Sequence, residues 1–216
     1  MEDVKGKILN SACTLFAKNG CKRITMDEVA NSIRISKRTL YEHYANKEEL
    51  IMACINYWQQ NIEKEAKMIE AMTDFPIWRM MFMGKLFRTY SHQNQLFFSD
   101  LEKYYPDIYK NHLAYPLNLR TKHIEKCLSM AQQQGYFREG VNLEVAAILM
   151  ANCTYHVLNS TVIPTPMRNV IIGEFMVNYM RGMLTSQAMV DFDKNQKEML
   201  AKLGDLQFES LRLENL

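Results

Sequence analysis

The amino-acid sequence predicts an all-α fold. Glycine (8) and proline (5) together make 13 of the 216 residues, about half the usual share, so tight turns are few and the elements between them are long. Apolar residues make up 48% of the chain, which is enough to build a sizeable core. They recur at helical spacing, and no segment alternates between apolar and polar residues as a half-buried strand does.

The first helices of this fold are short. Apolar residues at helical spacing predict a helix over residues 4–19. Thr25 and Glu28 stand three positions apart, as in a capping box whose two side chains satisfy backbone N–H groups at a helix start. We therefore expect a second helix at 25–32.

A third helix and a much longer fourth one follow. Ser36 can cap the third helix, which runs to about Tyr44. Asn46 and Glu49 form another capping pattern, and the amphipathic stretch behind it continues to about Met72. A helix over 47–72 would be roughly 39 Å long, enough to join an N-terminal domain to a separate body.

The remainder of the chain reads as long apolar and aromatic helices separated by proline and glycine. These helices are predicted at 77–91, 94–104, 107–134, 142–160, 167–187 and 191–213. The predicted domains are an N-terminal domain at 1–46, a larger helical body at 47–190 and a helical extension at 191–216. The extension either docks on the body or enlarges an interface.

Charge is distributed unevenly along this plan. The formal net charge of +2 is too small to indicate nucleic acid as a partner of the whole surface. Residues 5–47, however, hold nine basic and three acidic groups, a local charge of +6, which leaves −4 for the rest. If the protein has a basic binding site, that site must therefore be confined to one segment.

Three helices within 44 residues, with a tight turn between the second and third, are the layout of a helix-turn-helix. In that motif the third helix enters the DNA major groove, and its early residues contact base edges. The local positive charge supports this interpretation. A single helix-turn-helix contacts one half-site, so a two-fold homodimer on double-stranded DNA with a palindromic operator is expected.

The same segment contains three runs, in this order: Thr25-Met26-Asp27-Glu28-Val29-Ala30, Ile35-Ser36-Lys37-Arg38-Thr39-Leu40-Tyr41-Glu42-His43-Tyr44 and Asn46-Lys47-Glu48-Glu49-Leu50. They resemble the DNA-binding signature of the TetR (tetracycline repressor) family of bacterial transcription regulators. The resemblance is sharp over about the first fifth of the chain. Further on, only the total length, the helical character and the run Gly135-Tyr136-Phe137-Arg138 followed by Val141-Asn142 are similar.

Within this frame, residues at the start of the third helix are the candidates for base recognition. Lys37 and Arg38 suit guanine edges or phosphates, and Thr39 offers a methyl group and a hydroxyl. Thr25 and Lys47 suit phosphates at helix starts; the alternative is simple capping and surface charge, and both roles can coexist. The full DNA-binding set is Thr25, Arg34, Ser36, Lys37, Arg38, Thr39, Tyr41, His43 and Lys47.

Arg34 departs from the family pattern, which has a glycine in the turn. A non-glycine residue in the left-handed region costs about 1–2 kcal/mol. Either the turn adopts another geometry, or the cost is tolerated because the cation approaches a phosphate.

Aromatic side chains and 16 methionines fill the body. Such residues at helical spacing usually form core, yet they also suit an adaptable apolar cavity for a small-molecule effector. The candidates for this pocket are Trp78, Phe82, Tyr90, Tyr115, His123, Asn152, Tyr155 and His156.

The two apolar helices at 142–160 and 167–187 are candidates for the dimer interface. The resemblance implies that such a pair meets its copy in a four-helix bundle, whereas an interior pair of a monomer would show the same pattern. The predicted interface residues are Val145, Ile148, Leu149, Ile171, Phe175, Met176 and Tyr179.

Several other classes of protein are not indicated. The five cysteines are odd in number and never spaced C-x-x-C, which argues against a disulfide framework or a zinc site and favours a reducing cytoplasm. No export signal or membrane-spanning run is present. No metal-binding, nucleophile-elbow or phosphate-loop motif is present, so we expect neither an enzyme nor a cofactor.

The predicted function is that of a DNA-binding transcription regulator, more often a repressor, that leaves its operator when a mostly apolar or aromatic ligand binds. The alternative is a ligand-blind DNA-binding or adaptor protein whose body only dimerises or holds a protein partner.

Overall fold

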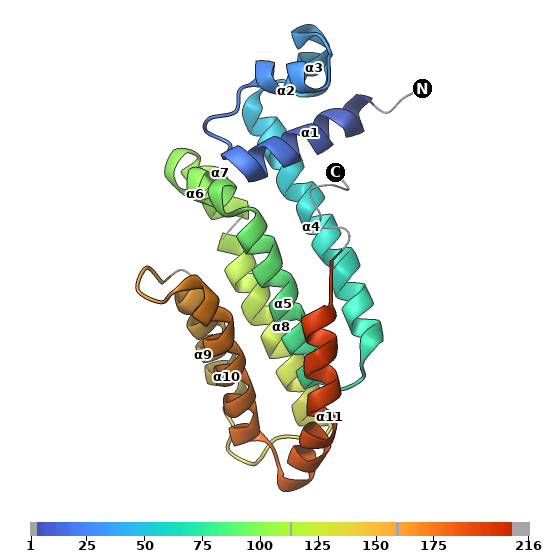
Figure 1. Cartoon of the computed structure of the whole chain (residues 1–216), viewed down its shortest axis with the longest axis vertical. Coiled ribbons are helices and arrows are strands. Elements are labelled where there is room, and N and C mark those ends of the chain that lie inside the picture. Colours follow the sequence, from blue (N-terminus) through green and yellow to red (C-terminus); the bar gives the residue numbers. More distant parts are fainter. Residues whose placement is uncertain (1–3, 113, 159, 209–216) are drawn as a thin grey trace. The chain divides into compact units, whose positions relative to one another are not determined.

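The computed structural model describes residues 4–112, 114–158 and 160–208; side chains at 112–120 lie outside this description. Eleven α-helices are found in the described part (Figure 1). Their bounds are α1 Val4–Asn19, α2 Met26–Ser32, α3 Lys37–His43, α4 Lys47–Met72, α5 Pro76–Gln93, α6 Gln95–Tyr104, α7 Pro106–His112, α8 Ala114–Gln133, α9 Leu143–Leu158, α10 Thr165–Met183 and α11 Ser186–Asp205. No β-strand occurs within those ranges, and the predicted all-α class is confirmed.

The chain gathers into two compact units. Among the described residues, the head unit holds 4–68, 86–115 and 207–208, and the body unit holds 69–85 and 116–206. The first part of α4 thus belongs to the head unit and its last turn to the body unit. The domains at 1–46, 47–190 and 191–216 follow the order of the chain rather than these contacts, and they remain a prediction.

The head unit is built around α1 and α6, which pack against each other. Phe16 of α1 and Phe97 of α6 stack with ring centroids 6.1 Å apart, and Trp58 of α4 meets Phe97 edge-on at 4.7 Å. All three side chains are buried. A segment far along the chain therefore forms part of the core beneath the helix-turn-helix.

The body unit has a separate aromatic core. Trp78 of α5 stacks on Phe192 of α11 with centroids 4.7 Å apart and nearly parallel rings. Lys85 Nζ donates to the carbonyls of Leu203 and Gly204, at 2.5 and 2.9 Å, near the end of α11. Of the two roles considered for the C-terminal extension, docking on the body is the one that these contacts show.

Two of the predicted helices differ most from the observed ones. The last long helix begins at Ser186, not 191, because Thr185 caps it by accepting a hydrogen bond from the N–H of Ala188. It ends at Asp205. The segment predicted as one helix at 107–134 consists of α7 and α8, and Leu113 between them lies outside the described residues.

The length and apolar character of these helices also bear on whether one of them could span a membrane. Among the described residues, none of the helices combines the length and apolar character needed to cross a bilayer.

Candidate nucleic-acid interface

The start of α2 is closed by the predicted capping box. Thr25 Oγ1 accepts a hydrogen bond from the N–H of Glu28 at 3.2 Å, and Glu28 Oε2 accepts one from the N–H of Thr25 at 2.7 Å. The bond from the Thr25 backbone is the main reason why the pKa of Glu28 lies below its ordinary value. Thr25 is exposed, so the cap lies on the surface of the head unit.

The turn between α2 and α3 places Arg34 in the left-handed region, with a φ of +57°. The Arg34 N–H donates to Asn31 O at 3.2 Å, and the Ile35 N–H donates to Ala30 O at 3.0 Å. The turn therefore keeps the conformation that favours glycine, and the alternative of another turn geometry is wrong. Arg34 is exposed.

Helix α3 is short and its two faces differ sharply. Ser36 caps it by accepting the N–H of Thr39 at 3.0 Å. Leu40 is fully buried beneath the helix, whereas Lys37 and Arg38 are exposed. The helix thus presents a cationic outer face on an apolar anchor, as a recognition helix requires.

Both cations on that face are held by carboxylates at the surface. Lys37 Nζ lies 2.9 Å from Asp27 Oδ1, and Arg38 Nε lies 3.0 Å from Glu42 Oε1. The hydrogen bond to Asp27 raises the pKa of Lys37. Exposed ion pairs contribute little to stability, so these cations can exchange their carboxylates for DNA.

The remaining predicted contacts lie near this face. Tyr41 is exposed, and Lys37 Nζ lies 6.0 Å from the centre of its ring. His43 is half-buried at the end of α3. Lys47, the first residue of α4, is also half-buried; its Nζ donates to Lys22 O at 3.2 Å, and burial lowers its pKa.

Residues 8–54 match the model of the family described as "Bacterial regulatory proteins, tetR family". The match covers 47 of the 216 residues, so this segment of the chain is similar to the tetR family. It is 41% identical over 59 residues to the biofilm operon icaADBC HTH-type negative transcriptional regulator IcaR of Staphylococcus epidermidis, a stretch that makes 26% of this chain and 32% of the relative. IcaR of Staphylococcus aureus is 32% identical over 80 residues, or 33% and 43% of the two chains. This chain thus spans less than half the length of these curated relatives.

Solved structures share the fold over most of the chain. CprB, a TetR family protein from S. coelicolor, covers 95% of this chain at 17% identity with a TM-score of 0.66, and 98% of its own chain is covered. The ketosteroid transcriptional regulator KstR2 of Mycobacterium tuberculosis covers 86% at 16% identity with a TM-score of 0.59, and 97% of its chain is covered. At these identities the likeness shows a shared fold.

The residues of the predicted effector pocket are dispersed in the structure. Trp78 and Phe82 are buried in the body unit, whereas Tyr90 is buried in the head unit beside Trp58. His123 is half-buried in α8, and burial is the main reason for its lowered pKa. The side chain of Tyr115 lies outside the described residues.

Three further pocket candidates lie on α9, and each of them is exposed. These are Asn152, Tyr155 and His156. The Asn152 amide donates to Ile148 O at 2.9 Å, within its own helix. All three side chains are exposed, and their role in an effector pocket remains a prediction.

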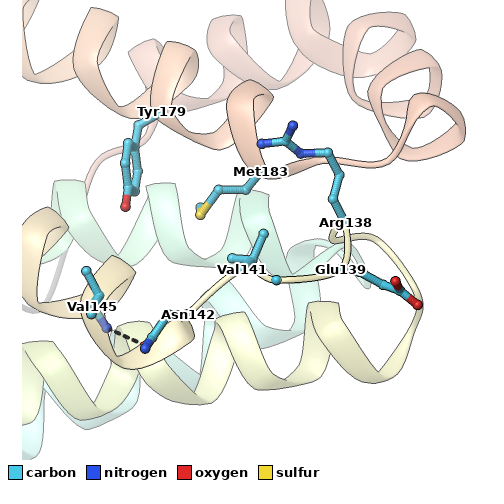
Figure 2. Close-up of a pocket in the computed structure, with 8 residues that line it drawn as sticks. Arg138, Glu139, Val141, Asn142, Val145, Tyr179 and Met183 are labelled. Carbon is cyan, nitrogen blue, oxygen red and sulfur yellow. Dashed lines mark hydrogen bonds between the residues drawn. The ribbon is translucent and has the colours of Figure 1, made fainter.

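Two surface cavities of the described body unit are lined by other residues. One, of about 340 Å³, has Arg138, Glu139 and Asn142 on the α8–α9 connection, and Tyr179 and Met183 project toward that connection from α10 (Figure 2). A second, of about 490 Å³, has Arg138 and Arg181 in its wall. None of the predicted pocket residues lines either cavity.

The predicted dimer residues are exposed on α9, whereas those on α10 are half-buried or buried. On α9, Val145, Ile148 and Leu149 are 45–49% exposed although they are apolar. On α10, Ile171, Phe175 and Tyr179 are half-buried and Met176 is buried. The two helices pack against each other, and α9 carries an apolar outer face that the chain itself leaves uncovered.

Sequence reasoning missed one residue of the head unit that contacts the helix-turn-helix segment. Asp100 of α6 accepts a hydrogen bond from the backbone N–H of Lys22 at 2.7 Å, across 78 positions of the chain. No motif or spacing marks a single carboxylate at that separation.

Proposed function

We propose that this chain binds operator DNA as a homodimer and represses transcription, and that a small, mostly apolar or aromatic effector releases it. The observation that carries the proposal is the α3 face, where exposed Lys37 and Arg38 stand above the buried Leu40. The IcaR relatives are named negative transcriptional regulators, which supports repression rather than activation.

Base recognition falls to the first turn of α3. Arg38 is suited to a guanine edge because its side chain is 90% exposed and its ion-pair partner, Glu42, lies on the same helix. Lys37 has to leave Asp27 to contact a base or a phosphate. Thr39 is half-buried beside Ser36, so its contribution is restricted to the outer part of the side chain.

Phosphate contacts fix the register on the duplex. Thr25, Arg34 and Lys47 are the candidates, with Ser36 and His43 at the two ends of α3. Arg34 is the clearest of them, because its exposed cation occupies a strained backbone position. A phosphate contact would explain why that strain is tolerated.

Dimerisation follows from the same function. One helix-turn-helix binds one half-site, and a palindromic operator needs two related by a two-fold axis. The apolar outer face of α9 is suited to an isologous interface, in which each copy contributes the same patch. Val145, Ile148 and Leu149 are its most exposed apolar members.

Effector control requires a ligand that binds one conformation more tightly than the other. The continuous helix α4 gives such a ligand a route to the DNA-binding segment, because its first residue, Lys47, is a predicted phosphate contact. The alternative is a ligand-blind DNA-binding or adaptor protein. Operator affinity measured with and without a saturating ligand separates the two, since an unchanged affinity contradicts release by that ligand.

Selection of bound DNA from a random duplex pool tests the DNA-binding part of the proposal. The expected result is an enriched inverted repeat. Lys37→Ala and Tyr41→Ala should abolish or change the enriched motif. Lys18→Ala removes the same charge from an exposed site at the end of α1, so it should weaken binding but leave the motif unchanged. Absence of enrichment at low salt would overturn the proposal.

A further inference from the structure

The loop that joins α1 to α2 is held on both sides of one residue. The Lys22 N–H donates to Asp100 Oδ2 on α6 at 2.7 Å, and Lys22 O accepts from Lys47 Nζ on α4 at 3.2 Å. The peptide groups on either side of Lys22 therefore join the start of α4 to α6, where Asp100 lies 53 positions beyond Lys47. The loop leads directly to Thr25, the cap of α2.

The approach of Asp100 to this loop is close enough to restrict the sequence. Gly20, at the end of α1, has a φ of +77°, and a Cβ built there would lie 2.3 Å from Asp100 Oδ2. A side chain at position 20 would strain the backbone at this φ and would displace the Asp100 carboxylate. The Lys22 ammonium lies 4.9 Å from the centre of the Tyr104 ring, also on α6.

We propose that Asp100 is a positioning residue for DNA binding: its carboxylate fixes the α1–α2 loop through the Lys22 N–H and so holds Thr25 and Lys47 where they meet the operator. The inference rests on the proposed DNA binding. Asp100 itself has no role in contacting DNA, because a carboxylate repels phosphates.

The charge of Asp100 allows a test in which two explanations predict opposite changes in operator affinity. If Asp100 acted only as one negative charge near DNA, Asp100→Ala would tighten operator binding. If the carboxylate orders the loop, the same change weakens binding, because the loop must then be ordered at the moment of binding. We expect operator affinity to fall about fivefold to tenfold, the range of one charge-assisted hydrogen bond.

Glu102→Ala is the matched control. Glu102 is exposed, lies two positions along α6 and carries the same charge, so its loss gives the pure charge effect, an operator affinity equal to or above that of the unaltered protein. If Asp100→Ala binds as tightly as Glu102→Ala, the proposal is overturned.

Asp100→Asn separates the hydrogen bond from loss of folding. Its amide oxygen can still accept the Lys22 N–H, so we expect operator affinity within about twofold of the unaltered protein. An Asn variant that folds, by circular dichroism, yet binds as weakly as the Ala variant contradicts positioning through this bond.

Hydrogen exchange at the Lys22 amide gives a readout that needs no DNA. The amide should exchange faster in Asp100→Ala than in Glu102→Ala. If the unaltered protein binds no DNA at all, the proposed function fails, whereas exchange still decides whether Asp100 holds the loop. Equal exchange in the two variants overturns the positioning role.

Discussion

Lys37 Nζ on α3 lies 3.0 Å from Asp27 Oδ2 on α2, so the two helices of the helix-turn-helix are joined at the surface by an ion pair. This pair holds the cation that is predicted to contact DNA. Both partners are exposed, and the pair therefore opens at little cost. If Lys37 contacts DNA as proposed, Asp27 competes with DNA for it.

Asp27→Asn should tighten DNA binding by about threefold to tenfold, because it removes a competing carboxylate and a repulsive charge. The measurement is operator affinity by fluorescence anisotropy at fixed salt. In the Lys37→Ala background the same change should have a smaller effect. Equal effects in the two backgrounds would show that the ion pair is not the cause.

Arg34→Gly should raise the free energy of unfolding by about 1 kcal/mol, because glycine adopts a positive φ without strain. It should also weaken DNA binding and lower the salt slope by about one unit if Arg34 contacts a phosphate. Arg34→Gln keeps the strain and loses the charge, so it should weaken binding without the gain in stability. Binding unchanged in both variants contradicts the phosphate contact.

Glu28→Gln should reduce stability in a pH-dependent manner. The folded-state pKa of Glu28 is lowered from 4.5, so its stabilisation is present above that pH and is lost as the pH falls through the folded value. Urea unfolding at about pH 7 and pH 3 measures the difference from the unaltered protein, which should shrink at the lower pH. The exposed Glu63→Gln is the control, and an undiminished difference at low pH argues against the capping carboxylate.

Phe192→Ala should lower the free energy of unfolding by about 3–5 kcal/mol, because it removes a fully buried ring from the stack on Trp78. Val190→Ala, an exposed position on the same helix, should change it by less than about 0.5 kcal/mol. Chemical denaturation measures both. Similar values for the two variants would mean that α11 is not part of the body core.

Leu149→Glu should shift the protein from dimer to monomer, because the predicted isologous interface would then hold two like charges without partners. Sedimentation velocity measures the change. Leu200→Glu introduces the same group on α11, where the leucine is 37% exposed, and should leave the dimer intact. A dimer that tolerates Leu149→Glu would place the interface elsewhere.

The sequence by itself determined the helix-turn-helix segment. Its signals are local: Thr25 with Glu28, Ser36 with Thr39, and Asn46 with Glu49 lie within one helical turn of each other, and α2, α3 and α4 begin where these caps predict. The sequence predicts the left-handed turn at Arg34 only as one of two alternatives. The backbone preference of arginine gives the energetic cost of that conformation, but it does not say whether the surrounding contacts impose it.

Only the tertiary structure decided which distant residues meet. The contact of Asp100 with Lys22 and that of Trp78 with Phe192 join segments that share no periodicity or motif. For the same reason the predicted effector residues were grouped by composition, yet the structure distributes Trp78, Tyr90 and Asn152 over two cores and an exposed helix face. Burial depends on how helices pack in three dimensions, and an apolar stripe specifies that a face is covered without specifying by what.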